Sequence, residues 1–172
     1  MHNSIAAIAT AHGVSSISII RVSGEASFEI AQKLSHLANI KTRYAHLTSL
    51  YTASDELIDQ AIMIYFAAPN SFTGEEIVEF QCHGGMIVAQ EILDTITSYG
   101  VRLAEPGEFS KRAFLNGKID LTEAEAISKT VTGLFRSSRI SKIWFLYPMA
   151  MARFKAPWLR ISFILFEKSL IL

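Results

Sequence analysis

The order of strand and helix patterns is the feature of this chain that most restricts its fold. Six short stretches have the apolar or alternating pattern of β-strands: residues 4–9, 17–22, 44–51, 61–66, 77–82 and 101–104. Helical patterns occupy residues 23–38, 86–98 and 106–115, and a further one begins near residue 122. Because strands and helices do not alternate regularly, the pattern predicts an α+β fold with a mixed β-sheet and about three helices.

Capping residues predict where three of these helices begin or end. Ser23 is expected to cap the first helix, with Glu25 in its first turn. Gly100 is expected just beyond the end of the second, where a left-handed residue commonly stops a helix. The string Thr122-Glu123-Ala124-Glu125 has the spacing of a capping box, so the last helix is expected to start there.

Composition excludes several classes of protein. Half of the 172 residues are hydrophobic and 19% are charged, which is too apolar for a disordered chain. The 16 basic and 16 acidic residues cancel, so the whole chain has no basic field for nucleic acid. One cysteine cannot form an internal disulfide framework or a thiolate zinc cluster. The N-terminus has no secretion-signal pattern, which favours a cytoplasmic location.

Charge divides the chain near residue 132. Residues 1–132 contain 9 Lys and Arg against 15 Asp and Glu, whereas residues 133–172 contain 7 against 1. Eight of the 18 aromatic residues also lie in the last forty. We therefore predict an acidic domain over 1–132 and a separate basic, aromatic-rich tail over 133–172. Basic residues interrupt the apolar runs of the tail, so no membrane-spanning helix is expected.

Two charged residues in predicted strands are candidates for ligand binding. Glu79 lies on the strand face opposite Val78 and Phe80, and Arg21 lies at the end of the second strand. If these faces are solvated, both residues are ordinary surface charges. If the faces line a cleft, Glu79 can accept paired N–H bonds from a heterocycle with adjacent ring N–H and exocyclic amine groups, and Arg21 can bind a carboxylate or phosphate.

The string His83-Gly84-Gly85 falls at a predicted strand-to-helix junction. Its glycines either permit a tight turn or leave helix N–H groups free for an anion. Cys82 and His83 should point to opposite faces of the strand, so a Cys–His nucleophile is not expected and Cys82 is interpreted as structural. No Walker string occurs, which excludes P-loop binding of GTP or ATP, and no catalytic residue or metal ligand is assigned.

Six strings together resemble the N-terminal domain of the bacterial tRNA modification GTPase family MnmE, also called TrmE. They are residues 4–10, 19–24, Pro69-Asn-Ser-Phe-Thr-Gly-Glu-Glu76, His83-Gly-Gly85, 106–118 and 119–126. The resemblance implies a fold similar to the folate-binding domain of aminomethyltransferases, with two domains pairing as a homodimer to form folate pockets. It also implies binding of 5-formyltetrahydrofolate or another tetrahydrofolate derivative. The family's folate contacts fall on Arg21, Glu79 and Lys118.

The same resemblance implies partners and a pathway. Members of the family act with an FAD-dependent MnmG protein to install an aminomethyl-type group on C5 of the wobble uridine of certain tRNAs. The acidic balance of residues 1–132 makes any tRNA contact of this chain indirect.

The resemblance stops near residue 132, before the family's GTPase domain and C-terminal cysteine. GTP, potassium and magnesium sites are therefore not expected here, and the chain is interpreted as a binding module rather than a complete enzyme. Two alternatives remain open: a stand-alone folate-dependent one-carbon transferase, and a non-functional truncation whose tail prevents dimerisation. The tail itself is interpreted as an altered end, such as an out-of-frame continuation of a truncated family member.

Overall fold

The protein is described from a computed structural model that covers residues 3–10 and 15–133. Its elements, in chain order, are β1 (Ile5–Ile8), β2 (Ile17–Ser23), α1 (Ser27–Ser35), β3 (His46–Tyr51), β4 (Leu57–Phe66), β5 (Ile77–His83), α2 (Met86–Ser98), β6 (Arg102–Leu103), α3 (Glu108–Leu115) and α4 (Leu121–Gly133). The chain divides into two units after Ala124, and the site below lies within the first. The predicted boundary at residue 132 stays a prediction, and the predicted tail beyond Gly133 lies outside the described residues.

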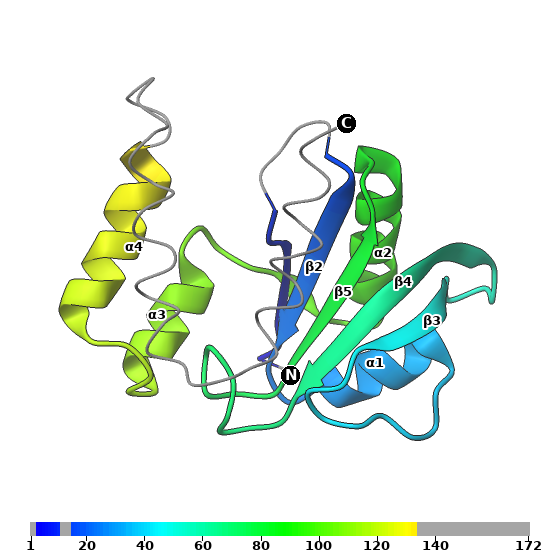
Figure 1. The fold of residues 1–172 in the computed structure, drawn as a ribbon, viewed down its shortest axis with the longest axis horizontal. Helices are drawn as coiled ribbons and strands as arrows, with labels where there is room; N and C mark the ends of the chain where they lie inside the picture. The colour runs from blue at the N-terminus through cyan, green and yellow to red at the C-terminus, as the bar shows by residue number, and fades with distance from the viewer. Residues whose placement is uncertain (1–2, 11–14, 134–172) are drawn as a thin grey trace. The chain divides into compact units, whose positions relative to one another are not determined.

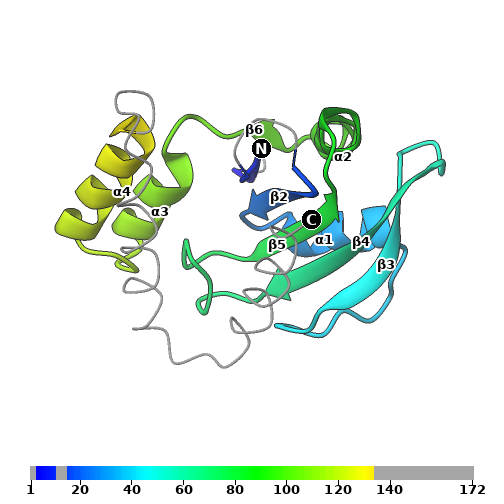
Figure 2. The ribbon, with the colours of Figure 1, turned by 45° about the horizontal axis from the view of Figure 1, so that its top comes forward.

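The six strands form one sheet in the order β3-β4-β5-β2-β1-β6 (Figure 1). Neighbouring strands are antiparallel except for β1 and β6, which pair in parallel through Ile5 with Arg102 and Ala6 with Leu103. Figure 2 shows β6 beyond β2, on the side of the sheet away from β3. The sheet is therefore mixed, and the predicted α+β class is confirmed. The described part of the chain contains four helices, one more than the approximate number expected.

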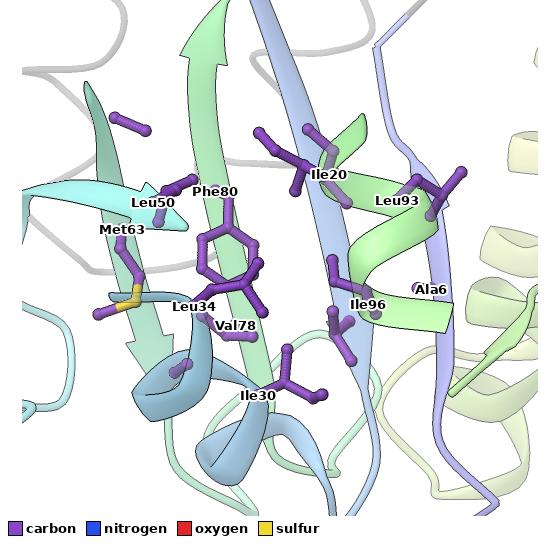
Figure 3. Packing of buried hydrophobic residues seen from close by; sticks show 14 of the residues in the cluster. Ala6, Ile20, Ile30, Leu34, Leu50, Met63, Val78, Phe80, Leu93 and Ile96 are labelled. Atoms are coloured by element: carbon purple, nitrogen blue, oxygen red, sulfur yellow. The ribbon is translucent and has the colours of Figure 1, made fainter. Parts of the chain in front are cut away.

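Helices α1 and α2 share one core with the sheet. Figure 3 shows Ile30 and Leu34 of α1 and Ile96 of α2 turned toward Val78 and Phe80 of β5 and the strands beside it. The strand alternation predicted for residues 77–82 is confirmed, since Val78, Phe80 and Cys82 are all buried.

The opposite side of the sheet, called the second face below, is less covered. Its side chains are partly exposed residues of β2, β4 and β5: Ile19, Arg21, Ile62, Ile64, Glu79 and Gln81. This face is neither a dry core nor a fully polar surface. It combines half-exposed apolar side chains with a charged pair near its middle.

The predicted cap of α1 is wrong. Ser23 ends β2, and its buried hydroxyl bonds to Thr73 and Glu75 instead of starting a helix. Helix α1 begins at Ser27, after Ala26, whose N–H donates to Oγ of Ser4 at 3.0 Å. Ser4, which directly precedes β1, thus accepts the hydrogen bond of a backbone N–H at the start of the helix. A capping side chain close in sequence would otherwise accept it.

Two further helix boundaries also differ in detail. Helix α1 ends at Ser35, because His36 adopts a left-handed conformation with φ of 56°. The capping box of α4 is formed by Asp120 rather than Thr122: Asp120 Oδ1 accepts from the N–H of Glu123, and Glu123 Oε2 accepts from the N–H of Asp120. Gly100 follows α2 with φ of 86°, as predicted.

The His83-Gly84-Gly85 junction is explained by close packing. The N–H of Gly84 donates to the carbonyl of Ser16 at 2.9 Å, and a methyl group on Gly84 would lie 1.6 Å from the carbonyl oxygen of Ser15. Gly85 has open space around its Cα and an extended φ of 167°. The structure therefore supports the tight-turn interpretation, and Gly84 is the residue that requires it.

None of the helices in the described ranges combines the length and apolar character needed to cross a bilayer.

Candidate functional site

Arg21 and Glu79 form an ion pair on the second face. They lie opposite each other where β2 pairs with β5, so the antiparallel register places both side chains on the same side of the sheet. Nε of Arg21 donates to Oε1 of Glu79 at 2.7 Å, and Nη2 contacts the same oxygen at 2.7 Å. The two side chains are 27% and 16% exposed. Among the described residues, Oε2 of Glu79 has no hydrogen-bond partner, so it can accept one from a ligand.

Two aromatic rings flank the Arg21 guanidinium. Its central carbon lies 5.6 Å from the ring centre of Phe72, in the 69–76 loop, and 5.7 Å from that of Phe109, in the first turn of α3. These distances suit cation–π attraction, in which the weakly hydrated guanidinium group of Arg takes part more often than the Lys ammonium. The site thus joins a strand pair, a loop and a helix around one charged centre.

Lys118 lies against the 69–76 loop. Its Nζ donates to the carbonyl of Pro69 at 2.8 Å, and Asn116 Nδ2 donates to the carbonyl of Thr73 at 2.7 Å. Gly74, with φ of 79°, leaves room for this segment, because a methyl group there would lie 3.2 Å from the Lys118 side chain. The structure therefore brings Arg21 and Glu79 into contact. Lys118 lies against the loop that carries Phe72, and its ammonium bonds to the backbone of that loop rather than to the ion pair.

A buried ionic cluster behind the site was missed by sequence reasoning. The Arg112 side chain of α3 is 9% exposed, and its Nη1 donates to both carboxylate oxygens of Glu75 at 3.0 and 3.1 Å. Its Nη2 donates to the carbonyl of Asn3 at 2.7 Å and to Oε1 of Glu108 at 3.1 Å. Arg102 also pairs with Glu108. The available signal was the charged spacing within residues 106–118, but nothing in that string names Glu75 as the partner.

The pKa of Glu108 lies far below its ordinary value. Hydrogen bonding from Arg102 lowers the pKa of Glu108 to about 2 from its usual 4.5, and burial opposes this only partly. The pKa of Glu108 is lower in the folded state than in the unfolded chain. Its contribution to stability is therefore complete above pH 4.5 and is lost as the pH falls toward 2.

We predict that Glu108→Gln flattens the acid limb of the stability curve. Between about pH 6 and pH 3 the wild-type chain should lose on the order of 2 kcal/mol more unfolding free energy than the variant, measured by denaturant titration. Glu91→Gln, on the exposed side of α2, is the control and should follow the wild type. Equal acid losses in the wild type and Glu108→Gln would contradict the assignment.

Cys82 does not have the surroundings of a reactive thiol. Cys82 is buried, its Sγ donates to the carbonyl of Ser18, and burial raises the pKa of its thiol to about 11. His83, its neighbour, is exposed on the other side of the strand, as predicted. Among the described residues, no three His, Cys, Asp or Glu side chains are grouped as a metal site.

A separate shallow hollow of about 800 Å³ lies between the β3–β4 turn and α2. Residues from 52–54 and the exposed side of α2, including Met86 and Ile87, line it. It contains none of the three predicted site residues, so we place the candidate site at the Arg21–Glu79 pair on chemical grounds.

Comparison with known proteins decides the family. The family model described as "GTP-binding protein TrmE N-terminus" matches residues 4–118. The chain belongs to this family. A tRNA modification GTPase MnmE from Sulfurovum sp. (strain NBC37-1) is 80% identical over 131 residues, covering 76% of this chain and 29% of the relative.

Two other relatives with the same name give the same coverage. The proteins from a Nitratiruptor species and from Aliarcobacter butzleri (strain RM4018) are 63% and 57% identical over 130 residues. The chain therefore spans less than a third of the length of these curated relatives, at 29% of each. The family's N-terminal domain is what this sequence shares with them.

Proposed function

We propose that this chain is a tetrahydrofolate-binding and dimerisation domain of an MnmE-like tRNA-modification protein. Membership of the TrmE N-terminal family supports the assignment to tRNA modification, as does the name of the relatives. The observation that carries the ligand proposal is the Arg21–Glu79 pair, in which one carboxylate oxygen is held and the other can still accept hydrogen bonds.

The chemistry of the pair fits a reduced pterin. A pterin edge presents a ring N–H beside an exocyclic amine, and Oε2 of Glu79, which has two lone pairs, can accept from this edge. Arg21 holds Oε1 of Glu79 and supplies a compensating positive charge, while its remaining N–H groups can reach a ligand carbonyl. When bound, a tetrahydrofolate derivative would supply the one-carbon unit, and the residues of this chain would bind and orient it.

Contact between Arg21 and Glu79 also constrains how the ligand lies. Two side chains that bond to each other must meet the same end of a long ligand, which we assign to the pterin. Lys118, held on the 69–76 loop, is then the group for a carboxylate of the glutamate tail. Its ammonium can leave the Pro69 carbonyl for an anion, because a charged acceptor forms the stronger hydrogen bond.

A second copy of the chain is the proposed cover for the site. Ile19, Ile62 and Ile64 surround the ion pair on the second face and are partly exposed, and Leu47 at its margin is 70% exposed. Half-exposed apolar side chains grouped on one face of a sheet are typical of a surface that another protein covers. In cells we expect this dimer in the cytoplasm, with an MnmG-like FAD protein as partner and with tRNA contacted indirectly.

The proposal is tested by measuring mass and binding on the same full-length sample. Sedimentation equilibrium should give a dimer, and calorimetric titration with 5-formyltetrahydrofolate should give saturable binding. Lys118→Ala should weaken the binding of 5-formyltetrahydrofolate by about tenfold. It should leave the affinity for a pterin that lacks the glutamate tail unchanged.

Other results of these two measurements would favour one of the alternative functions. A monomer that binds no folate would identify a non-functional truncation. Turnover of a folate-linked one-carbon group by the isolated chain would identify a transferase. Either result would overturn the proposed function.

A further inference from the structure

The Arg112 guanidinium joins three segments that are distant in the sequence. Its hydrogen bonds reach Asn3 before β1, Glu75 in the 69–76 loop and Glu108 at the start of α3. A buried guanidinium with carboxylates on two sides and a carbonyl on a third has its N–H groups directed at acceptors on all three sides. Such a centre fixes the relative position of the segments that it joins.

The loop side of this cluster is itself tied to the strand that carries Arg21. Ser23 donates to Oε2 of Glu75 at 2.7 Å, and the hydroxyls of Ser23 and Thr73 are 2.7 Å apart. The N–H of Glu75 donates to Oγ1 of Thr73 at 3.2 Å. Ser23 is two residues beyond Arg21 in β2, so the loop is anchored beside the ion pair as well as against α3.

Both aromatic rings that flank Arg21 belong to the segments held by Arg112. Phe72 lies three residues before Glu75, and Phe109 directly follows Glu108. Because each ring is within about 6 Å of the guanidinium, a small shift of either segment would remove it from cation–π range. The position of the rings therefore depends on how Arg112 holds these two segments.

We propose that Arg112 is a positioning residue for the ligand site: it keeps Phe72 and Phe109 over Arg21 and so fixes the orientation of the Arg21–Glu79 pair. This inference rests on the proposed function for its consequence in ligand binding. Its structural part concerns the free protein. The two parts can therefore be tested separately.

The first measurement uses the Arg21 Nε–Hε resonance of the full-length chain without any folate. Ring currents from Phe72 and Phe109 should move this proton upfield, and its bond to Glu79 should slow its exchange. Arg112→Lys keeps the charge but cannot reach all three segments with one planar fork. The variant should lose most of the upfield displacement while the backbone amide spectrum of the sheet is retained.

Matched variants separate positioning from general stability. Arg102→Lys changes another partner of Glu108, and within the described residues the side-chain bonds of Arg102 go to Glu108 and Leu103. It should keep the Arg21 displacement. Glu75→Gln weakens the same contact from the loop side, because it removes the charge and one of the two acceptor oxygens. This side chain is 27% exposed, and the variant should change the Arg21 resonance in the same direction as Arg112→Lys. If Arg112→Lys does not fold, Glu75→Gln decides the question alone.

The second measurement is affinity for 5-formyltetrahydrofolate, which should fall roughly tenfold in Arg112→Lys and remain unchanged in Arg102→Lys. An unaltered Arg21 resonance in folded Arg112→Lys or Glu75→Gln would overturn the inference. A wild-type chain that binds no folate would instead contradict the proposed function, and the resonance would still report on positioning.

Discussion

Gly84→Ala should destabilise the protein by about 3 kcal/mol or more, the largest effect that we expect from a single methyl group in this chain. The new carbon would lie 1.6 Å from the Ser15 carbonyl oxygen and 2.6 Å from the carbonyl carbon of Ser16. These are backbone atoms, so rotation of a side chain cannot relieve the clash. The Gly84 N–H bond to Ser16 must lengthen or break as the two segments separate.

The neighbouring glycine provides the control. Gly85 has no atom within 4 Å of an added methyl group and an extended backbone that any residue adopts. Gly85→Ala should therefore change the unfolding free energy by less than about 1 kcal/mol in the same denaturant titration. Equal destabilisation by the two substitutions would show that close packing at Gly84 does not explain the motif.

The sheet could be predicted from the sequence because its strands alternate. Val78, Phe80 and Cys82 are buried as their spacing requires, and the irregular order of strands and helices is enough to indicate a mixed sheet. The residues at which helices begin and end were harder to predict. Ser23 has the right type for a cap, but its hydroxyl bonds to residues about fifty positions away, and a local rule contains no such information.

The site could be predicted only in part. The resemblance selects Arg21 and Glu79, but their contact depends on the register between β2 and β5, and a slip of one residue would place one of them on the other face. Phe72 and Phe109 carry no pattern of their own. Arg112 looks like an ordinary charge of an amphipathic helix until the fold brings Glu75, 37 residues away, against it.

Glu79→Gln should reduce affinity for 5-formyltetrahydrofolate by about 100-fold. The substitution keeps the shape of the side chain but removes the charge that pairs with Arg21. It also replaces one acceptor oxygen with an amide donor, which would face the donors of a pterin edge. Since the site is at a partly exposed position on the sheet, the fold should be retained.

Gln81→Ala is the matched control for this substitution. Gln81 lies two residues further along β5 on the same face and is also partly exposed. If the second face bound folate through general burial alone, changes at residues 79 and 81 would have similar effects. We expect Gln81→Ala to bind within about threefold of the wild type, because it removes no group assigned to the ligand.

Calorimetric titration of the full-length wild type and Glu79→Gln with 5-formyltetrahydrofolate, side by side, tests the central claim most directly. We predict one bound ligand per chain for the wild type and an affinity loss of about 100-fold for the variant, with unchanged circular dichroism. Equal affinities in the two proteins would contradict the claim that the Arg21–Glu79 pair receives the pterin.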